Sequence, residues 1–174
     1  NSNWIKLNGS ILANNTISPN GTLTADKLIV NNGFGSCDLR TTNSISIVSN
    51  GVYTWSIYVK SAGYDLFRLT AWTSDDPATI FNLSNITIVS EFGPEHTSTI
   101  VDVGNGWRRL TITRVSTASV AWMRCTPVAP NNSLQNGIDG VYIWGAQLTQ
   151  GAKARPYQAT TNRLNFPRID YSSG

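Results

Sequence analysis

Aromatic and basic side chains at alternating positions are the residues of this chain best suited to contact a ligand. Six tryptophans occur in 174 residues, and alternation within short apolar segments turns Trp72 and Trp122 away from the expected core. Flat aromatic rings stack on the C–H face of a pyranose ring, while arginine donates hydrogen bonds to hydroxyl groups. The predicted ligand-binding residues, expected to share one outward face, are Trp72, Trp122, Tyr58, Arg68, Arg109 and Arg124.

The same face has a second interpretation, in which it packs against a neighbouring subunit or a loop. Both interpretations stay open on the sequence alone. Tryptophan is highly buried on average, so the other four tryptophans are assigned to the core or its rim: Trp4, Trp55, Trp107 and Trp144.

The chain has few side chains suited to catalysis. The single histidine, His96, lies in the Gly- and Pro-marked stretch "FGPEHTS", and such loops run over the surface by default. No G-x-S-x-G nucleophile motif accompanies it, and Glu91 and Glu95 are the only glutamates for a reaction that needs two placed carboxylates. The sequence predicts a protein that is not an enzyme.

Metal and cofactor motifs are equally sparse. Cys37 and Cys125 are far apart, with no second pair of ligands nearby, which argues against zinc. Buried free thiols are favoured, while a disulfide stays open. Calcium is a candidate cofactor through loop carbonyls with Asp26 or Asp139, but nothing in the spacing requires it, so the metal prediction is left unknown.

The charge balance limits the classes of partner that the protein is expected to bind. Thirteen basic and ten acidic residues give a net charge of +3, and charged residues make up 13% of the chain. The basic residues are scattered, so the footprint of a nucleic-acid-binding surface is missing, and no run of about 18 apolar residues indicates a membrane span. A neutral, hydroxyl-rich partner suits this composition better than nucleic acid or a membrane.

The elements that must position these residues are short alternating segments bounded by Gly, Asn, Ser or Pro, a pattern typical of an all-β sandwich or barrel. About ten of them would form two packed antiparallel sheets. The segments are 4–8, 26–31, 44–49, 52–60, 65–73, 79–90, 97–103, 107–115, 119–128 and 137–150.

Alternation also predicts the core. The segment "VYIWGAQL" is apolar on both parities and should be covered on both sides. In the other segments the expected inward residues are Tyr53, Trp55, Ile57, Val59, Phe67, Leu69, Ala71, Leu110, Ile112, Ala121, Met123 and Cys125.

The composition shifts near Gly151 toward small and basic residues with two prolines. We therefore predict one domain over residues 1–160 and a connector to a following module over 161–174.

Four segments in this order resemble a known family: "SPNGTLTADKLIVNN", "YTWSIYVKSAG", "DVGNGWRRLTITR" and "GVYIWGAQLTQGAKARPYQATTNR". They resemble the carbohydrate-binding-module-like β-jelly-roll domains of bacteriophage virion proteins such as tail fibres, tail spikes and appendages. The resemblance covers nearly the whole chain from Trp4 to Tyr171, and "GNGW" and "YIWGAQL" are its most specific parts.

The resemblance implies a jelly-roll fold whose last strand passes through Trp144 and pairs near the N-terminal strand. By analogy, the chain is expected to be a non-catalytic carbohydrate-binding domain of a phage structural protein, extracellular and part of the virion. Its partners would be a polysaccharide or cell-surface glycan and other virion modules, with a homo-oligomer left open. The alternative is a structural assembly or spacer jelly roll without glycan affinity.

Overall fold

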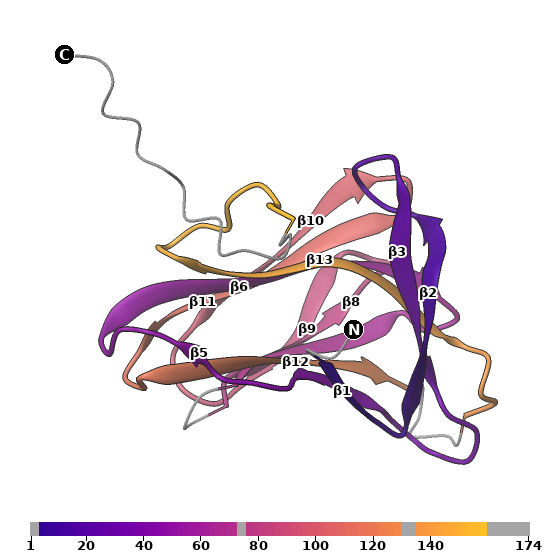
Figure 1. Cartoon of the computed structure of the whole chain (residues 1–174), viewed down its shortest axis with the longest axis horizontal. Helices are drawn as coiled ribbons and strands as arrows, with labels where there is room; N and C mark the ends of the chain where they lie inside the picture. The colour runs from indigo at the N-terminus through magenta and orange to yellow at the C-terminus, as the bar shows by residue number, and fades with distance from the viewer. Residues whose placement is uncertain (1–3, 73–75, 130–134, 160–174) are drawn as a thin grey trace.

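The protein folds as two antiparallel β-sheets packed face to face, as the computed structural model in Figure 1 shows. The structure describes residues 4–72, 76–129 and 135–159, except for the side chain of Trp72. All regular elements in these ranges are strands. The predicted fold class, an all-β jelly-roll sandwich of two antiparallel sheets, is confirmed.

Sheet A, the lower layer in Figure 1, has the strand order β1-β4-β12-β7-β8-β9, with the short strand β5 paired to β12. Its strands are β1 (Trp4–Leu7), β4 (Asp38–Thr41), β5 (Ile45–Ser46), β7 (Leu66–Trp72), β8 (Ala78–Asn82), β9 (Thr87–Phe92) and β12 (Val120–Val128).

Sheet B has the order β10-β11-β6-β13-β3-β2; in Figure 1 β13 and β6 lie above sheet A, and β3 and β2 run down the right-hand side. Its strands are β2 (Gly9–Ile17), β3 (Leu23–Val30), β6 (Gly51–Ala62), β10 (Thr97–Gly104), β11 (Trp107–Ser116) and β13 (Gly140–Gln150).

The core lies between the two sheets and is built by alternation, as expected. Every residue predicted to point inward is buried, including Trp55, Phe67 and Leu110, which are fully enclosed. Trp107 is also buried, and Trp4 packs against the edge of the core. Burial of these large apolar side chains supplies the main driving force for closing the sandwich.

Two strands were missed in the sequence, and one strand was predicted where the structure has two. Strands β2 and β4 were not predicted, since β2 is mostly exposed and β4 is only four residues long. The expected strand 79–90 breaks into β8 and β9 because the Asn82 side chain accepts hydrogen bonds from the amides of Ser84 and Asn85, a local turn that competes with the ladder.

The last strand, β13, pairs with β3 on one side and β6 on the other. The expectation that it lies near the N-terminal strand is wrong for β1, which pairs with β4 in the opposite sheet. After β13 the chain doubles back over the outer face of sheet B (Figure 1). We call residues 151–159 the C-terminal segment; the predicted connector 161–174 lies outside the described residues.

The two cysteines are buried free thiols, as predicted. Burial, together with the nearby charge of Asp38, raises the pKa of Cys37 to about 12. Burial likewise raises the pKa of Cys125. Both groups are therefore protonated and behave as small apolar side chains at neutral pH.

Candidate functional site

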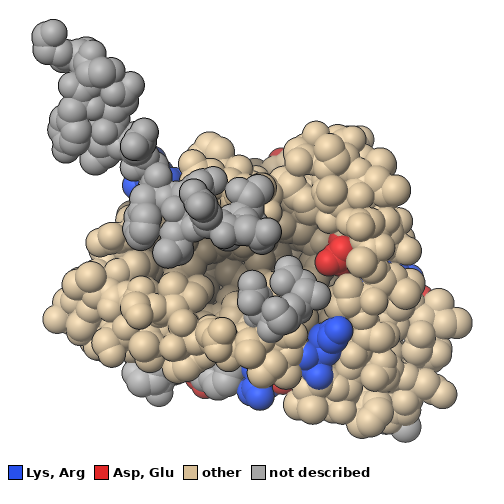
Figure 2. All heavy atoms as spheres, viewed as in Figure 1, with Lys and Arg blue, Asp and Glu red and all other residues tan. Residues whose placement is uncertain are grey.

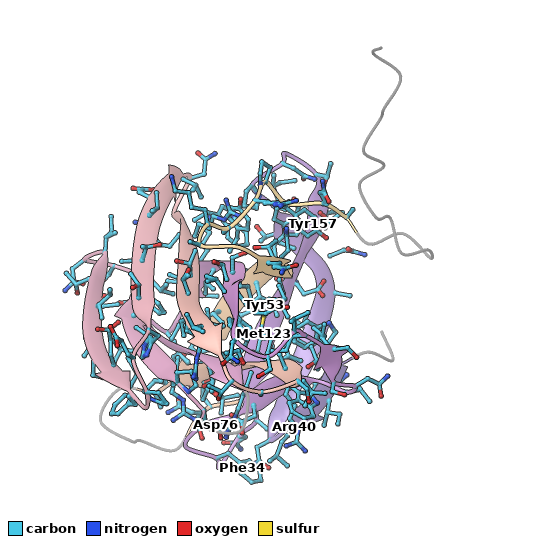
Figure 3. The ribbon with its side chains drawn as sticks, turned by 90° about the vertical axis from the view of Figure 1, so that its left-hand side faces the viewer. Phe34, Arg40, Tyr53, Asp76, Met123 and Tyr157 are labelled. Carbon is cyan, nitrogen blue, oxygen red and sulfur yellow. The ribbon has the colours of Figure 1, made fainter. Side chains whose placement is uncertain are left out.

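The six predicted ligand-binding residues do not share one face. Arg68, Trp72, Trp122 and Arg124 belong to sheet A, whereas Tyr58 and Arg109 belong to sheet B. Figure 3 shows the two outer faces on opposite sides of the molecule, with Tyr157 above, Arg40 below and Met123 between the sheets. Alternation shows which side chains point outward from a strand, but it does not show which sheet the strand joins.

On sheet B, Tyr58 contacts Trp144 edge to face, with ring centroids 5.4 Å apart. Trp144 in turn contacts Tyr157 of the C-terminal segment at 4.3 Å. Gly145 makes room for this cluster at a β-bulge, since a Cβ there would lie 3.1 Å from Tyr58 and 3.2 Å from Tyr157. Trp144 lies outside the core, and β13 is covered on both sides, as its double apolar parity predicted.

Arg109 also contacts the C-terminal segment. Its guanidinium lies 5.1 Å from the centre of the Tyr58 ring and donates to the backbone carbonyl of Arg155. The Thr54 hydroxyl donates to the carbonyl of Gly151 at 2.8 Å. Tyr58 and Arg109 are thus engaged by the chain itself. Tyr157, which sequence reasoning missed, lies in a stretch with no alternation to mark it.

Sheet A presents a different outer surface. Trp122 is half-buried and is the backbone partner of Trp72, whose side chain is not described. Two residues further along each strand, Arg124 pairs with Thr70, and then Thr126 pairs with Arg68. The neighbouring strand β4 adds Arg40, opposite Arg124. Sheet A therefore brings four of the six predicted residues onto neighbouring strands.

Asp38 organises this surface, although the sequence did not single it out. Its carboxylate accepts hydrogen bonds from Arg124 at 2.5 Å and from the Thr126 hydroxyl at 2.6 Å. Burial would raise the pKa of Asp38, but these bonds, and the charges of Arg124 and Arg68, lower it below its ordinary value. Asp38 is thus held as a carboxylate with two partners.

Among the described residues, no carboxylate is hydrogen-bonded to Arg68, although the charge of Asp38 acts on it. Its Nε is buried without a hydrogen bond, as is the hydroxyl of Thr70 beside it. Burial lowers the pKa of Arg68, and the positive charge of Arg124 lowers it further, while Asp38 acts in the opposite direction. Arg68 stays charged at neutral pH, because arginine has a very high intrinsic pKa. We call Asp38, Arg68, Arg124 and Thr126 the arginine cluster.

The arginine cluster borders an open depression of about 320 Å³ on the outer side of sheet A. Its floor comes from three adjacent strands and its rim from the chain before β4 and after β12. The lining residues are Gly35, Ser36, Arg68, Ile80, Thr126, Val128 and Ala129. The depression combines an apolar wall with a guanidinium and a hydroxyl, a composition suited to small polar ligands.

His96 does not lie in a solvated loop position as expected. Its side chain is 4% exposed and lies 3.7 Å from Glu91. It bonds to the Thr79 hydroxyl at 3.0 Å and to the carbonyl of Pro94 at 2.7 Å. These bonds explain its burial, because buried polar groups need partners. The His96 side chain thus connects the residues just before β10 to Thr79 of β8.

The two aspartates considered for calcium are engaged in loop hydrogen bonds. Asp26 accepts from the amide of Asn14, and Asp139 accepts from the Asn136 side chain. Within the described ranges, no three His, Cys, Asp or Glu side chains gather as a metal-binding group. In the same ranges, no helix is long and apolar enough to cross a membrane.

Charge is sparse on the surface in Figure 2, where most of the visible atoms belong to uncharged residues and the few blue and red groups are scattered. This agrees with the low charged fraction of the chain. The arginine cluster, with two guanidinium groups around one carboxylate, is a local departure from that composition.

The protein is a two-sheet β-jelly-roll, and comparisons with solved structures bear on the fold. The structure is similar to the enzymatically active domain of tailspike protein 4 from bacteriophage CBA120, with a TM-score of 0.51 at 11% identity over 86% of this chain. It also matches a structure of the CBM22-1 and GH10 modules of the N-terminal endo-1,4-β-D-xylanase 10B of Clostridium thermocellum, complexed with xylohexaose. That match has a TM-score of 0.49 at 14% identity over 92% of this chain.

These similarities extend over a minor part of the other proteins. The chain spans 19% of the tailspike chain and 28% of the xylanase chain. No family model and no curated protein matches the sequence. The similarity to the tailspike domain concerns the fold alone, and a function has to be argued from the site.

Proposed function

We propose that the protein is a non-catalytic carbohydrate-binding domain, and that it binds polysaccharide on the outer face of sheet A. The observation that carries the proposal is the position of Trp122, half-buried on the strand that also carries Arg124 and, four residues after Trp122, Thr126 of the depression. A tryptophan ring supplies a stacking surface for a sugar, and nearby guanidinium and hydroxyl groups supply hydrogen bonds.

The other outer face suits this role less well. Tyr58 and Arg109 are engaged by the C-terminal segment, and Tyr157 is packed on Trp144. A sugar would have to displace these contacts before stacking there. Sheet A is therefore the face we assign to the ligand.

The expected affinity of a single site of this kind is micromolar to millimolar, raised when many copies act together. The similarity in fold to a phage tailspike domain supports the proposal that the domain belongs to a virion protein and acts outside the host cell. Display on a virion would supply those copies.

The test is affinity electrophoresis of the purified domain through gels containing plant, bacterial or algal polysaccharides. Trp122→Ala is expected to weaken retardation by about tenfold or more, since loss of one stacked aromatic removes roughly 1.4 kcal/mol or more of binding energy. Trp144→Ala is the matched control on sheet B and is expected to bind normally. Normal binding by Trp122→Ala with loss in Trp144→Ala would move the site to sheet B.

The second candidate is a structural module of a virion, serving assembly or spacing. The same fold similarity favours it, and it predicts a stable oligomer in which the sheet A face is covered. Light scattering after size exclusion, with acrylamide quenching of tryptophan fluorescence, distinguishes the two. A stable oligomer with shielded Trp122 and no retained polysaccharide would favour assembly over recognition.

A further inference from the structure

Arg68 stands out because the neighbouring acid, Asp38, acts on it through charge without a hydrogen bond. Asp38, the acidic member of the arginine cluster, is already bonded to Arg124 and Thr126. The Nε of Arg68 is buried without a partner, and the charged groups that act on Arg68 are Arg124, which repels it, and Asp38. The cluster therefore carries two guanidinium charges and one carboxylate charge.

Such an arrangement is unfavourable in isolation. Partial burial removes water from a charged group, and burying a charge without an opposite charge is costly. An anion that approaches Arg68 would relieve the repulsion from Arg124.

The depression gives the anion a way to reach Arg68. Arg68 lines it together with Thr126 and the backbone-rich turn at Gly35 and Ser36, and Ile80 and Val128 form an apolar wall. A volume of about 320 Å³ is at the lower end of the range for small-molecule pockets. It suits one sugar ring with its substituent better than a large ligand.

From this geometry we propose that the depression binds the carboxylate of an acidic sugar unit, with Arg68 as the carboxylate-binding residue. The planar guanidinium of arginine matches a carboxylate in a two-bond geometry that lysine does not offer. The apolar wall contacts the ring of the same sugar. This inference rests on the proposed function and narrows its ligand class from polysaccharides in general to polymers of uronic acid type.

The experiment compares polymers that differ in the charged group alone. Polygalacturonate and its fully methyl-esterified form share one backbone, and dextran sulfate and dextran form a second pair with sulfate in place of carboxylate. Binding of the full chain is measured by affinity electrophoresis and by calorimetry with short oligomers. The expected result is preference for polygalacturonate over its ester, with dextran sulfate weaker.

Arg68→Gln is expected to weaken binding of polygalacturonate by about tenfold to a hundredfold, the range for a lost hydrogen bond to a charged group. Binding of the methyl ester should be unchanged. Arg68→Lys keeps the charge but not the two-bond geometry, so it should fall between wild type and Arg68→Gln. Arg155→Gln removes the same charge from the exposed C-terminal segment on the other side and should bind like wild type.

The outcomes separate this inference from the proposed function. Equal binding of acid and ester, with Trp122→Ala still defective, would overturn the carboxylate site and keep the carbohydrate-binding role. Equal weakening of binding in Arg155→Gln would reduce the effect to non-specific charge attraction and overturn the inference. Binding to none of the four polymers would overturn it as well. Circular dichroism of each variant checks that the fold is retained.

Discussion

At the scale of single residues, Asp38 links three strands of sheet A through one side chain. It lies on β4, and its two hydrogen-bond partners lie on β12, while the charge of Arg68 on β7 also acts on it. A carboxylate held in this way has a lower pKa in the folded protein than in the unfolded chain, so its ionised form contributes to stability.

This linkage predicts a specific pH dependence. The stabilisation by Asp38 is complete above the ordinary carboxyl pKa of 3.8 and is lost as the pH falls through the lower pKa of the folded state. The free energy of unfolding of wild type should therefore fall more steeply than that of Asp38→Asn as the pH falls below about 4. Urea unfolding at several pH values measures both curves, and parallel curves would contradict the linkage.

The sequence predicted part of this site. The outward positions of Arg68, Trp122 and Arg124 followed from alternation in long segments with clear inward residues. Asp38 could not be found in the same way, because β4 has four residues and only Leu39 among them is buried. Tertiary pairing with β12, rather than local pattern, makes that segment a strand.

At the scale of elements, the contact between β13 and β3 depends on the absence of a side chain at Gly140. A Cβ at this position would lie 1.9 Å from the carbonyl oxygen of Leu28, which is backbone held in the ladder of sheet B. Neither strand can move away easily, since β13 is also paired with β6 on its other side.

Gly140→Ala is therefore expected to destabilise the fold by about 2 kcal/mol or more, in the range of overpacking in a well-packed interior. Gly21→Ala is the control, because Gly21 has a φ of +85° but no heavy atom within 4 Å of the added Cβ. That change should cost only about 1–2 kcal/mol of backbone strain. Denaturant unfolding measures both, and a smaller effect at Gly140 than at Gly21 would contradict the steric argument.

Strand positions were predicted well where alternation runs for six or more residues with a buried inward set, as in β6, β7, β11 and β12. The edge strand β2 failed this condition because most of its side chains are exposed. The boundary between β8 and β9 was missed for another reason. A turn made by the Asn82 side chain interrupts a segment in which apolar and polar residues continue to alternate.

At the scale of the whole molecule, the C-terminal segment forms part of the folded domain through contacts with sheet B. It supplies Tyr157 to the cluster with Trp144, and its backbone accepts hydrogen bonds from Thr54 and Arg109. The sequence indicated a change of composition near Gly151, but it could not predict this docking, which rests on single contacts without a periodic pattern.

Deletion of residues 152–174 is expected to increase acrylamide quenching of Trp144 fluorescence and to lower the Tm by about 2–4 °C for each kcal/mol of lost contacts. Deletion of 160–174 alone should keep the contacts made by residues 151–159 and leave both measurements close to wild type. Repeating the longer deletion in a Trp144→Phe background assigns the change, since the added quenching should then disappear. Equal quenching in both deletions would contradict the docking.

The position of the C-terminal segment has a mechanical consequence. Because residues 151–159 lie on sheet B, tension applied beyond residue 159 acts first on their contacts with β6, β11 and β13. The hydrogen bonds from Thr54 and Arg109 would yield before the strand ladders. Sheet A, on the other side of the core, would keep its shape while the C-terminal segment detached and extended by several residues. The segment can therefore act as an extensible tether, which lengthens under tension without disturbing the opposite surface.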